Sequence, residues 1–189
     1  MKILVTAFGP FGGRSGNASS LALRELKIAF PEIHTRILPV DSVVAPVRLK
    51  QALRQLRPGI LIMLGEAAGS KVIRLETTAW NELDFTIPDI AGRQPLARPV
   101  LSKSPAALNA TLPLEEIHAS LVSLGHQAVL SDDAGRYLCN QLSFVALDYL
   151  QRHAIPCAAG FIHLPLAEDY PTDRATAVLG HVIHALRQS

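Results

Sequence analysis

Short, strongly apolar runs alternate along this chain with longer segments whose apolar residues recur at helical spacing, and this alternation restricts the fold more than any other feature. The runs Lys2–Phe8 and Ile60–Leu64 carry apolar residues at both odd and even positions, as strands do that are buried on both faces of a sheet. The segment Val43–Leu56 repeats apolar residues every three or four positions and indicates an amphipathic helix. Together these patterns predict an α/β fold, a single-domain sandwich with a mainly parallel, twisted central sheet and helices on both faces.

The same patterns place the individual elements. Strands are expected at 2–8, 33–40, 60–64, 71–81, 127–131 and 155–164, and helices at 17–30, 41–56, 114–124, 137–153 and 172–187. Asn17 or Ser19 should cap the first helix, and Asp41 or Ser42 the second. The strand at 71–81 has one more polar face and should lie near an edge of the sheet. The segment 82–113 contains five prolines and little periodicity, so we expect a long functional loop with at most a short strand or hairpin.

Composition narrows the possible functions. With 189 residues, 49% hydrophobic and 18% charged, the chain suits one compact domain, residues 1–189, and is too apolar for a disordered protein. Eighteen Lys and Arg residues nearly balance 16 Asp and Glu residues without a basic cluster, so we expect no nucleic-acid partner. The longest apolar stretch, Gly59–Gly65, is far shorter than the ~20 residues that span a membrane. We therefore expect no membrane association, no signal peptide and a cytoplasmic protein.

A glycine-rich loop, Ala7–Gly16, follows the first strand, where a nucleotide-binding protein would carry its phosphate loop. Its spacing matches neither phosphate-binding pattern, and Phe8 and Phe11 stand where such a loop presents backbone amides. Two aromatic rings held by glycines and a proline would suit a small, flat, uncharged group. The residues alone are equally compatible with two phenylalanines of the core.

Two side chains are candidates for nucleophilic catalysis. Cys139 stands at the start of the helix at 137–153, where the aligned peptide dipoles favour a thiolate. His163 ends the strand at 155–164 and is a candidate general base. Spacing does not decide which carboxylate would orient the imidazole, and the candidates are Glu66, Glu76, Asp84, Asp89, Asp132 and Asp133.

The other cysteine and the other histidines suggest no second site. Cys157 lies within a strand pattern and is typical of a buried core thiol, an interpretation that Cys139 considered alone would also allow. The remaining histidines are scattered, so we expect no metal.

Five blocks carry the most specific motifs. They are Phe8–Gly13 with Asn17, Leu64–Gly69 leading to Glu76–Asn81, Ile87–Pro95, Ser131–Asn140 and Gly160–Pro165. In order and spacing they resemble the F-D-P-F-G-G…N-P-S, G-x-A-G-G-R…E-R-V-A-x-N, I-P-D-N-x-G-x-Q-P, S-x-x-A-G-x-Y-x-C-N and G-F-I-H-x-P patterns of the pyroglutamyl peptidases. These cysteine peptidases are also called pyrrolidone-carboxylate peptidases. The resemblance covers essentially the whole chain.

The resemblance implies the residues of an active site. It places the nucleophile at Cys139, the general base at His163 and the orienting carboxylate at Glu76, which spacing alone did not single out. The expected substrate-binding residues are Phe8, Phe11, Glu66, Tyr137, Leu138 and Ile87.

The resemblance also implies an activity. The expected reaction is hydrolysis of the bond after an N-terminal pyroglutamyl residue through a thioester, with release of free pyroglutamate. The expected partners are therefore peptides with N-terminal pyroglutamate, and neither a metal nor another cofactor is implied. Because members of the family often form dimers or tetramers, a homodimer or homotetramer is expected.

The chain departs from the family pattern at several positions. The family carries arginine where this chain has Ser70 and Thr86, so two arginines near the expected site are missing. Arg136 or Arg74 would supply the lost positive charge. Glu66 replaces a usual Gln or Leu, and we hypothesise that its carboxylate accepts a hydrogen bond from the lactam N–H. The alternative is a solvated loop carboxylate.

Two other functions are compatible with the sequence. The missing arginines would suit a catalytically weak homologue that only binds pyroglutamyl or other blocked N-termini. The lack of a phosphate loop would permit a hydrolase or nucleosidase of similar architecture that acts on another small ring.

Overall fold

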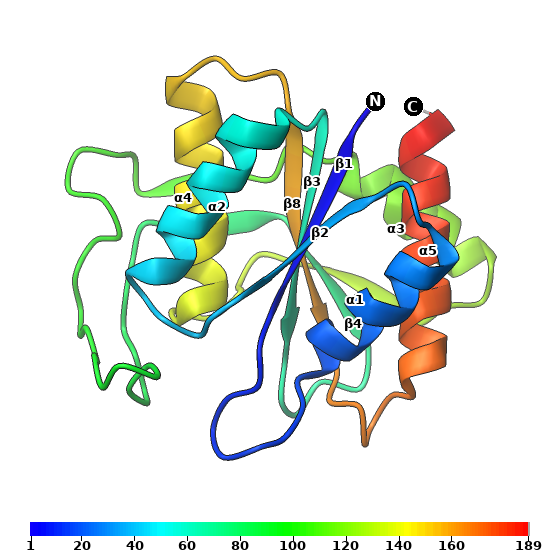
Figure 1. Ribbon diagram of the computed structural model, residues 1–189, viewed down its shortest axis with the longest axis horizontal. Coiled ribbons are helices and arrows are strands. Elements are labelled where there is room, and N and C mark those ends of the chain that lie inside the picture. The colour runs from blue at the N-terminus through cyan, green and yellow to red at the C-terminus, as the bar shows by residue number, and fades with distance from the viewer. Residues whose placement is uncertain (189) are drawn as a thin grey trace.

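A six-stranded sheet forms the centre of the computed structural model, which describes residues 1–188 (Figure 1). Its strands are β1 (Ile3–Phe8), β2 (His34–Leu38), β3 (Ile60–Glu66), β4 (Ile73–Glu76), β7 (Ala128–Ser131) and β8 (Ala158–Leu164), in the order β2-β1-β3-β8-β4-β7. All neighbouring strands are parallel except β4 and β8, which are antiparallel. The predicted mainly parallel α/β fold is confirmed.

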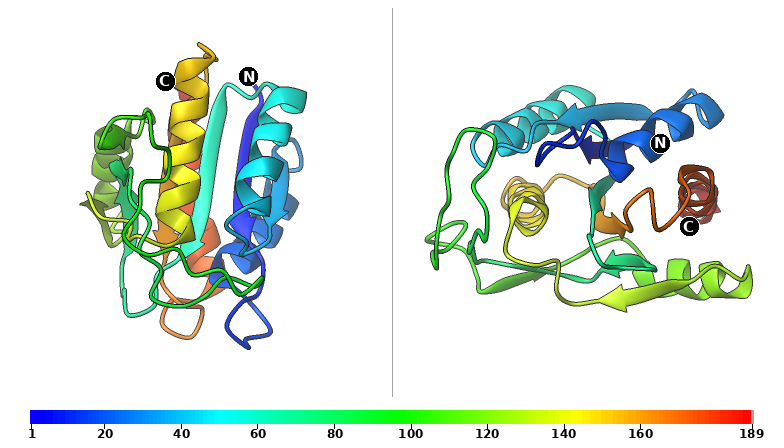
Figure 2. Two further views of the ribbon diagram at one scale, coloured as in Figure 1. Left: turned by 90° about the vertical axis from the view of Figure 1, so that its left-hand side faces the viewer. Right: turned by 90° about the horizontal axis from the view of Figure 1, so that it is seen from below.

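Helices cover both faces of the sheet (Figures 1 and 2). One face carries α1 (Ala18–Ala29), α3 (Leu114–Ser123) and α5 (Thr172–Gln188), and the other carries α2 (Val44–Leu56) and α4 (Leu138–Arg152). Each face has its own hydrophobic core because side chains alternate along a strand. In β1, Val5 and Ala7 pack with α1 and α5, whereas Leu4 and Phe8 pack with α2 and α4. Within residues 1–188, no helix is both long and apolar enough to span a membrane.

The capping residues act largely as expected. Asn17 caps α1, since its Oδ1 accepts the N–H of Ser19. The second helix begins at Val44, later than predicted. Asp41 still satisfies the start of that helix, because its Oδ1 accepts the N–H groups of Val43 and Val44.

The prediction of one strand at 71–81 is wrong. β4 ends at Glu76, and β5 (Thr78–Trp80) leaves the main sheet to pair with β6 (Ala107–Asn109) in a separate two-stranded sheet. The break falls at Thr77, whose N–H donates to a carbonyl of β7 and whose carbonyl accepts from the residue after β6. This one residue therefore belongs to the hydrogen-bond networks of both sheets.

A buried carboxylate anchors the long loop between β5 and β6. Asp89 accepts hydrogen bonds from the N–H and hydroxyl of Ser42, from the N–H groups of Ala91 and Arg93, and from Arg93 Nε. Burial raises the pKa of Asp89, but these donors outweigh burial and hold its pKa far below the ordinary value. Arg93 also pairs with Asp41, so the loop is fixed to the start of α2.

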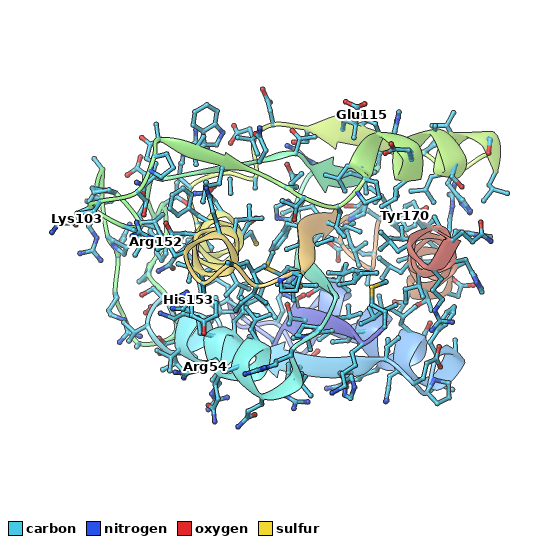
Figure 3. All side chains as sticks on the ribbon, turned by 90° about the horizontal axis from the view of Figure 1, so that it is seen from above. Arg54, Lys103, Glu115, Arg152, His153 and Tyr170 are labelled. Atoms are coloured by element: carbon cyan, nitrogen blue, oxygen red, sulfur yellow. The ribbon has the colours of Figure 1, made fainter. Side chains whose placement is uncertain are left out.

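The two ends of the sheet differ. The carboxyl ends of β1, β2, β3 and β8 lie together at the lower end of Figure 1, where open α/β sheets bind their ligands. The opposite end holds a cavity of about 560 Å³ between the C-terminal ends of α2 and α4. Figure 3 looks onto that end and labels two of the lining residues, Arg54 and His153.

Replacing Asp89 by Ala tests the loop anchor. It should lower the free energy of unfolding by about 2–4 kcal/mol, because several buried donors lose their acceptor. The deficit should shrink as the pH falls below about 4, since the wild-type carboxylate stabilises the fold only while it is ionised. Asp84→Ala, at an exposed position of the same loop, is the control and should cost less than about 0.5 kcal/mol in the same urea titrations. Equal losses in the two variants would contradict the anchor.

Candidate active site

Three polar side chains from different elements meet at the carboxyl end of β8. His163 lies in β8, and its Nδ1 is 2.8 Å from Oε1 of Glu76 in β4. Cys139, the second residue of α4, lines the same cavity as His163. Because Glu76 engages Nδ1, Nε2 is the ring nitrogen left to exchange a proton with the cysteine. The arrangement has the order of a nucleophile, a base and an orienting carboxylate.

The charged groups around His163 favour the protonated form of its imidazole. Burial lowers the pKa of His163, but the negative charge and hydrogen bond of Cys139, followed by those of Glu76, raise it to about 9. Burial raises the pKa of Glu76, but the hydrogen bond and charge of His163, then the hydrogen bond of Ser131 and the charge of Arg74, hold it below its ordinary value. At neutral pH the site therefore contains an imidazolium beside an ionised carboxylate.

The close approach of Cys139 to β3 requires a glycine. A Cβ on Gly65 would stand 2.9 Å from the Cys139 sulfur and 2.7 Å from the ring of Phe161. Gly65 is the register partner of His163 in the neighbouring strand β8. The missing side chain thus leaves room for the sulfur directly beside the imidazole.

Two amides that follow the cysteine fix the start of α4. Asn140 is fully buried; its Oδ1 accepts the N–H of Trp80, and its Nδ2 donates to the carbonyls of Trp80 and Glu82. Gln141 donates from Nε2 to the carbonyl of Ser42. These bonds hold the helix start against β5 on one side and against the loop before α2 on the other.

The first turn of α4 offers donors for an anion. Within the described chain, the N-cap residue Tyr137 makes no side-chain capping hydrogen bond. The N–H groups at the start of a helix have no partner inside the helix. Those beside Cys139 are therefore candidates for an oxyanion hole.

A cavity of about 380 Å³ opens at the cysteine and the histidine. Its lining is mixed in polarity and comes from the ends of β3 and β8, from β4, and from the first turn of α4 and the segment before it. The lining residues are Glu66, Ala67, Arg74, Asp133, Ala134, Gly135, Tyr137, Cys139 and His163.

The aromatic residues expected around a substrate occupy two environments. The ring of Tyr137 lies 5.9 Å from Phe11 and 4.4 Å from Phe85, measured between centroids. Phe8 is 4% exposed and packs in the core between the sheet and helices α2 and α4. Phe85 is 0% exposed in the same core as Phe8, so it supports the Tyr137 ring and does not itself line the cavity.

The two remaining apolar candidates also differ. Leu138 is 2% exposed and belongs to the core below α4. Ile87 is 49% exposed on the long loop. The hydroxyl of Tyr137 donates to the carbonyl of Pro88 at 3.2 Å, which holds this part of the loop beside the aromatic rings.

Glu66 lies at the cavity with both carboxylate oxygens engaged. Oε2 accepts the N–H of Ala18 at 2.8 Å, and Oε1 pairs with Arg14. The carboxylate therefore joins the end of β3 to the glycine-rich loop and to the start of α1. The alternative of a solvated loop carboxylate is wrong.

Only one of the two arginines considered as replacements contacts the three-residue site. Arg74 Nε lies 3.1 Å from Glu76 Oε1. Arg136 instead pairs with Glu82 and Asp133 and lies over the ring of Trp80.

Cys157 has a different environment. It lies just before β8, it is buried, and burial raises its pKa to about 11. Among residues 1–188, no cluster of three or more histidine, cysteine or acidic side chains is arranged to hold a metal ion.

Comparisons with known proteins agree with one another. A family model described as pyroglutamyl peptidase matches residues 1–180. The pyrrolidone-carboxylate peptidase of Chromobacterium violaceum is 41% identical over 166 residues, which are 86% of this chain and 77% of the relative. That of Pyrococcus furiosus is 34% identical over 177 residues, 92% of this chain and 85% of the relative.

Solved structures show the same likeness. A mutant pyrrolidone carboxyl peptidase from P. furiosus has a TM-score of 0.93 and 29% identity, and covers 100% of this chain and 99% of its own. The pyroglutamyl peptidase I of Bacillus amyloliquefaciens has a TM-score of 0.87 and 30% identity, and covers 95% and 91% of the two chains.

Iodoacetamide tests the difference between the two cysteines. At neutral pH it should alkylate Cys139, which lines a cavity beside an imidazolium, and leave Cys157 unmodified because that thiol is buried and protonated. Peptide mass mapping reads out both positions in one sample. Faster modification of Cys157 in the folded protein would contradict the geometry.

Proposed function

Because the chain belongs to the pyroglutamyl peptidase family, we propose that it hydrolyses the bond after an N-terminal pyroglutamyl residue, with Cys139 as nucleophile, His163 as general acid and base, and Glu76 as orienting carboxylate. The observation that carries this proposal is the 2.8 Å bond from Glu76 to His163 Nδ1, with the cysteine at the same imidazole. The substrates are peptides with N-terminal pyroglutamate.

The first half of the reaction forms a thioester. The thiolate of Cys139 attacks the pyroglutamyl carbonyl carbon, and the first N–H groups of α4 stabilise the resulting oxyanion. The intermediate collapses as the C–N bond breaks, and the His163 imidazolium gives its proton to the leaving amine. The shortened peptide leaves, and His163 is then neutral.

The second half releases pyroglutamate. Neutral His163 takes a proton from a water molecule, whose oxygen attacks the thioester carbon. The C–S bond breaks, pyroglutamate leaves as a free acid, and Cys139 returns as a thiolate beside the imidazolium. Glu76 stays ionised throughout and holds the ring in one orientation.

Aromatic rings support selectivity for the lactam. The rings of Phe11 and Tyr137 lie tilted against each other, and Tyr137 lines the cavity of the nucleophile, which suits a flat, uncharged ring. Phe85 is fully buried and supports the Tyr137 ring from the core. Glu66 uses two of its roughly four acceptor positions for Ala18 and Arg14, so it retains capacity to accept the lactam N–H.

The binding-only alternative is not favoured, because the matching family model and the relatives are peptidases of this kind, and the position of Cys139 at the cavity of the Glu76–His163 pair supports the same conclusion. No observation supports a different ring substrate. Assembly into a homodimer or homotetramer stays a prediction.

Replacing the proposed nucleophile and base tests the activity. Cys139→Ala and His163→Ala should each lower release of a chromogenic amine from a pyroglutamyl amide by at least about 10³-fold, because each removes one member of the catalytic unit. Cys157→Ala is the matched control and should retain full activity. Wild-type levels of release by Cys139→Ala would contradict the proposal.

The pH profile tests the role of His163. Release of the amine requires the imidazolium, so kcat/KM should fall as the pH rises through about 9. A decline centred near the ordinary histidine pKa of about 6.5 would contradict the ionisation described above.

Glu66→Gln tests the lactam contact. The amide keeps the shape of the side chain but weakens the bonds to Arg14 and to the substrate N–H, so KM should rise several-fold with little change in kcat. Unchanged kinetics for a pyroglutamyl amide would rule out this role.

A further inference from the structure

One guanidinium joins three parts of the proposed active site. Arg74 donates from Nε to Glu76 Oε1 at 3.1 Å. It also donates from Nη2 to the hydroxyl of Ser131 and to the carbonyl of Asp133, both at 2.7 Å. Its side chain is 34% exposed and lines the cavity that contains Cys139.

The three acceptors lie at points that determine the geometry of the reaction. Glu76 ends β4 and orients the imidazole. Ser131 ends β7, the neighbouring strand. Asp133 belongs to the segment between β7 and α4, and this segment leads directly to Cys139. By binding these three oxygens, Arg74 connects the carboxylate that orients the base, the neighbouring strand and the segment that leads to the nucleophile.

We propose that Arg74 is a positioning residue that holds the orienting carboxylate and the segment before the nucleophile in a fixed relation. The inference rests on the proposed function and adds a residue to it. Arg74 acts through Glu76 and through the Asp133 carbonyl, without contact to the reacting atoms.

Arginine is the residue type that this role requires. The planar guanidinium presents several N–H donors in a rigid fork, so one side chain can bind three oxygens in different directions. A lysine would bring the same charge as a compact point and could not keep all three bonds. Because about a third of the Arg74 side chain is exposed, water screens its charge and weakens its electrostatic effect on Glu76.

Two cations pair with the Glu76 carboxylate, and Arg74 is the second of them after His163. Glu76 faces His163 from β8 and Arg74 from its own strand. The carboxylate of Asp133 pairs with Arg136, so its charge is already engaged elsewhere. Glu66 pairs with Arg14. Among residues 1–188, removing Arg74 would thus leave His163 as the only cation paired with Glu76.

Three variants separate positioning from general stability. Arg74→Met removes the charge and all three hydrogen bonds while keeping a long, unbranched side chain. Arg74→Lys keeps the charge. Arg136→Met is the control, because it removes an arginine of the same region that does not contact Glu76. Each folded variant is assayed for kcat and KM with a pyroglutamyl amide between pH 5 and pH 10, and its thermal unfolding is recorded.

For Arg74→Met we expect kcat to fall about 10- to 100-fold with little change in KM, because the reacting groups are misplaced. The low-pH side of its kcat profile, here called the acid limb, should move to higher pH. Glu76 loses a cation that favours its ionised form, so it becomes protonated at a higher pH. Arg74→Lys should lose kcat but keep the acid limb near that of the wild type. Arg136→Met should stay within about threefold in kcat with an unmoved acid limb.

The result that would overturn the inference is an Arg74→Met protein with kcat within threefold of the wild type and an unmoved acid limb. The rate of Cys139 alkylation by iodoacetamide, measured over the same pH range, needs no substrate. If the wild type released no amine, the proposed function would fail. A changed alkylation profile in Arg74→Met but not in Arg136→Met would still support the role of Arg74, and unchanged profiles in both would refute it.

Discussion

The hydrogen bond between Glu76 and Nδ1 of His163 is the contact on which the rest of the site depends. It exists because β4 enters the sheet antiparallel to β8, which places Arg74 opposite His163 and puts Glu76 within reach on the same face. The carboxylate holds the imidazole so that its other nitrogen is left for Cys139, and the missing side chain at Gly65 gives the sulfur its room. Fold and chemistry are thus coupled through one pair of strands.

Much of the fold follows from local patterns, because strands buried on both faces and amphipathic helices leave clear periodicities. The reversed direction of β4 and the break at Thr77 do not, since four-residue strands carry no directional signal. One clue was present: the connection at 67–72 is too short for the crossover that parallel strands need. The break itself is set by bonds to segments distant in sequence.

The site was predictable to different degrees. Cys139 and His163 follow from their places at a helix start and a strand end, and Glu76 followed only from family resemblance, because its position depends on how β4 pairs with β8. The core contact of Phe85 with Tyr137 is not predictable, because Phe85 lies in an aperiodic loop whose path is set by the buried bonds of Asp89. For Phe8 the residues alone allow either a pocket or the core, and family resemblance favours the pocket; its ring packs in the core, because it ends a strand buried on both faces.

Labelling with a pyroglutamyl chloromethyl ketone tests the central claim most directly, because the reagent reports the nucleophile and the ring selectivity together. The account predicts a covalent adduct on Cys139 that depends on His163 and Glu76. It also predicts much slower labelling by the prolyl analogue, whose ring nitrogen is charged and would be desolvated beside the aromatic rings. Labelling at another residue, or equal rates with the two reagents, would contradict it.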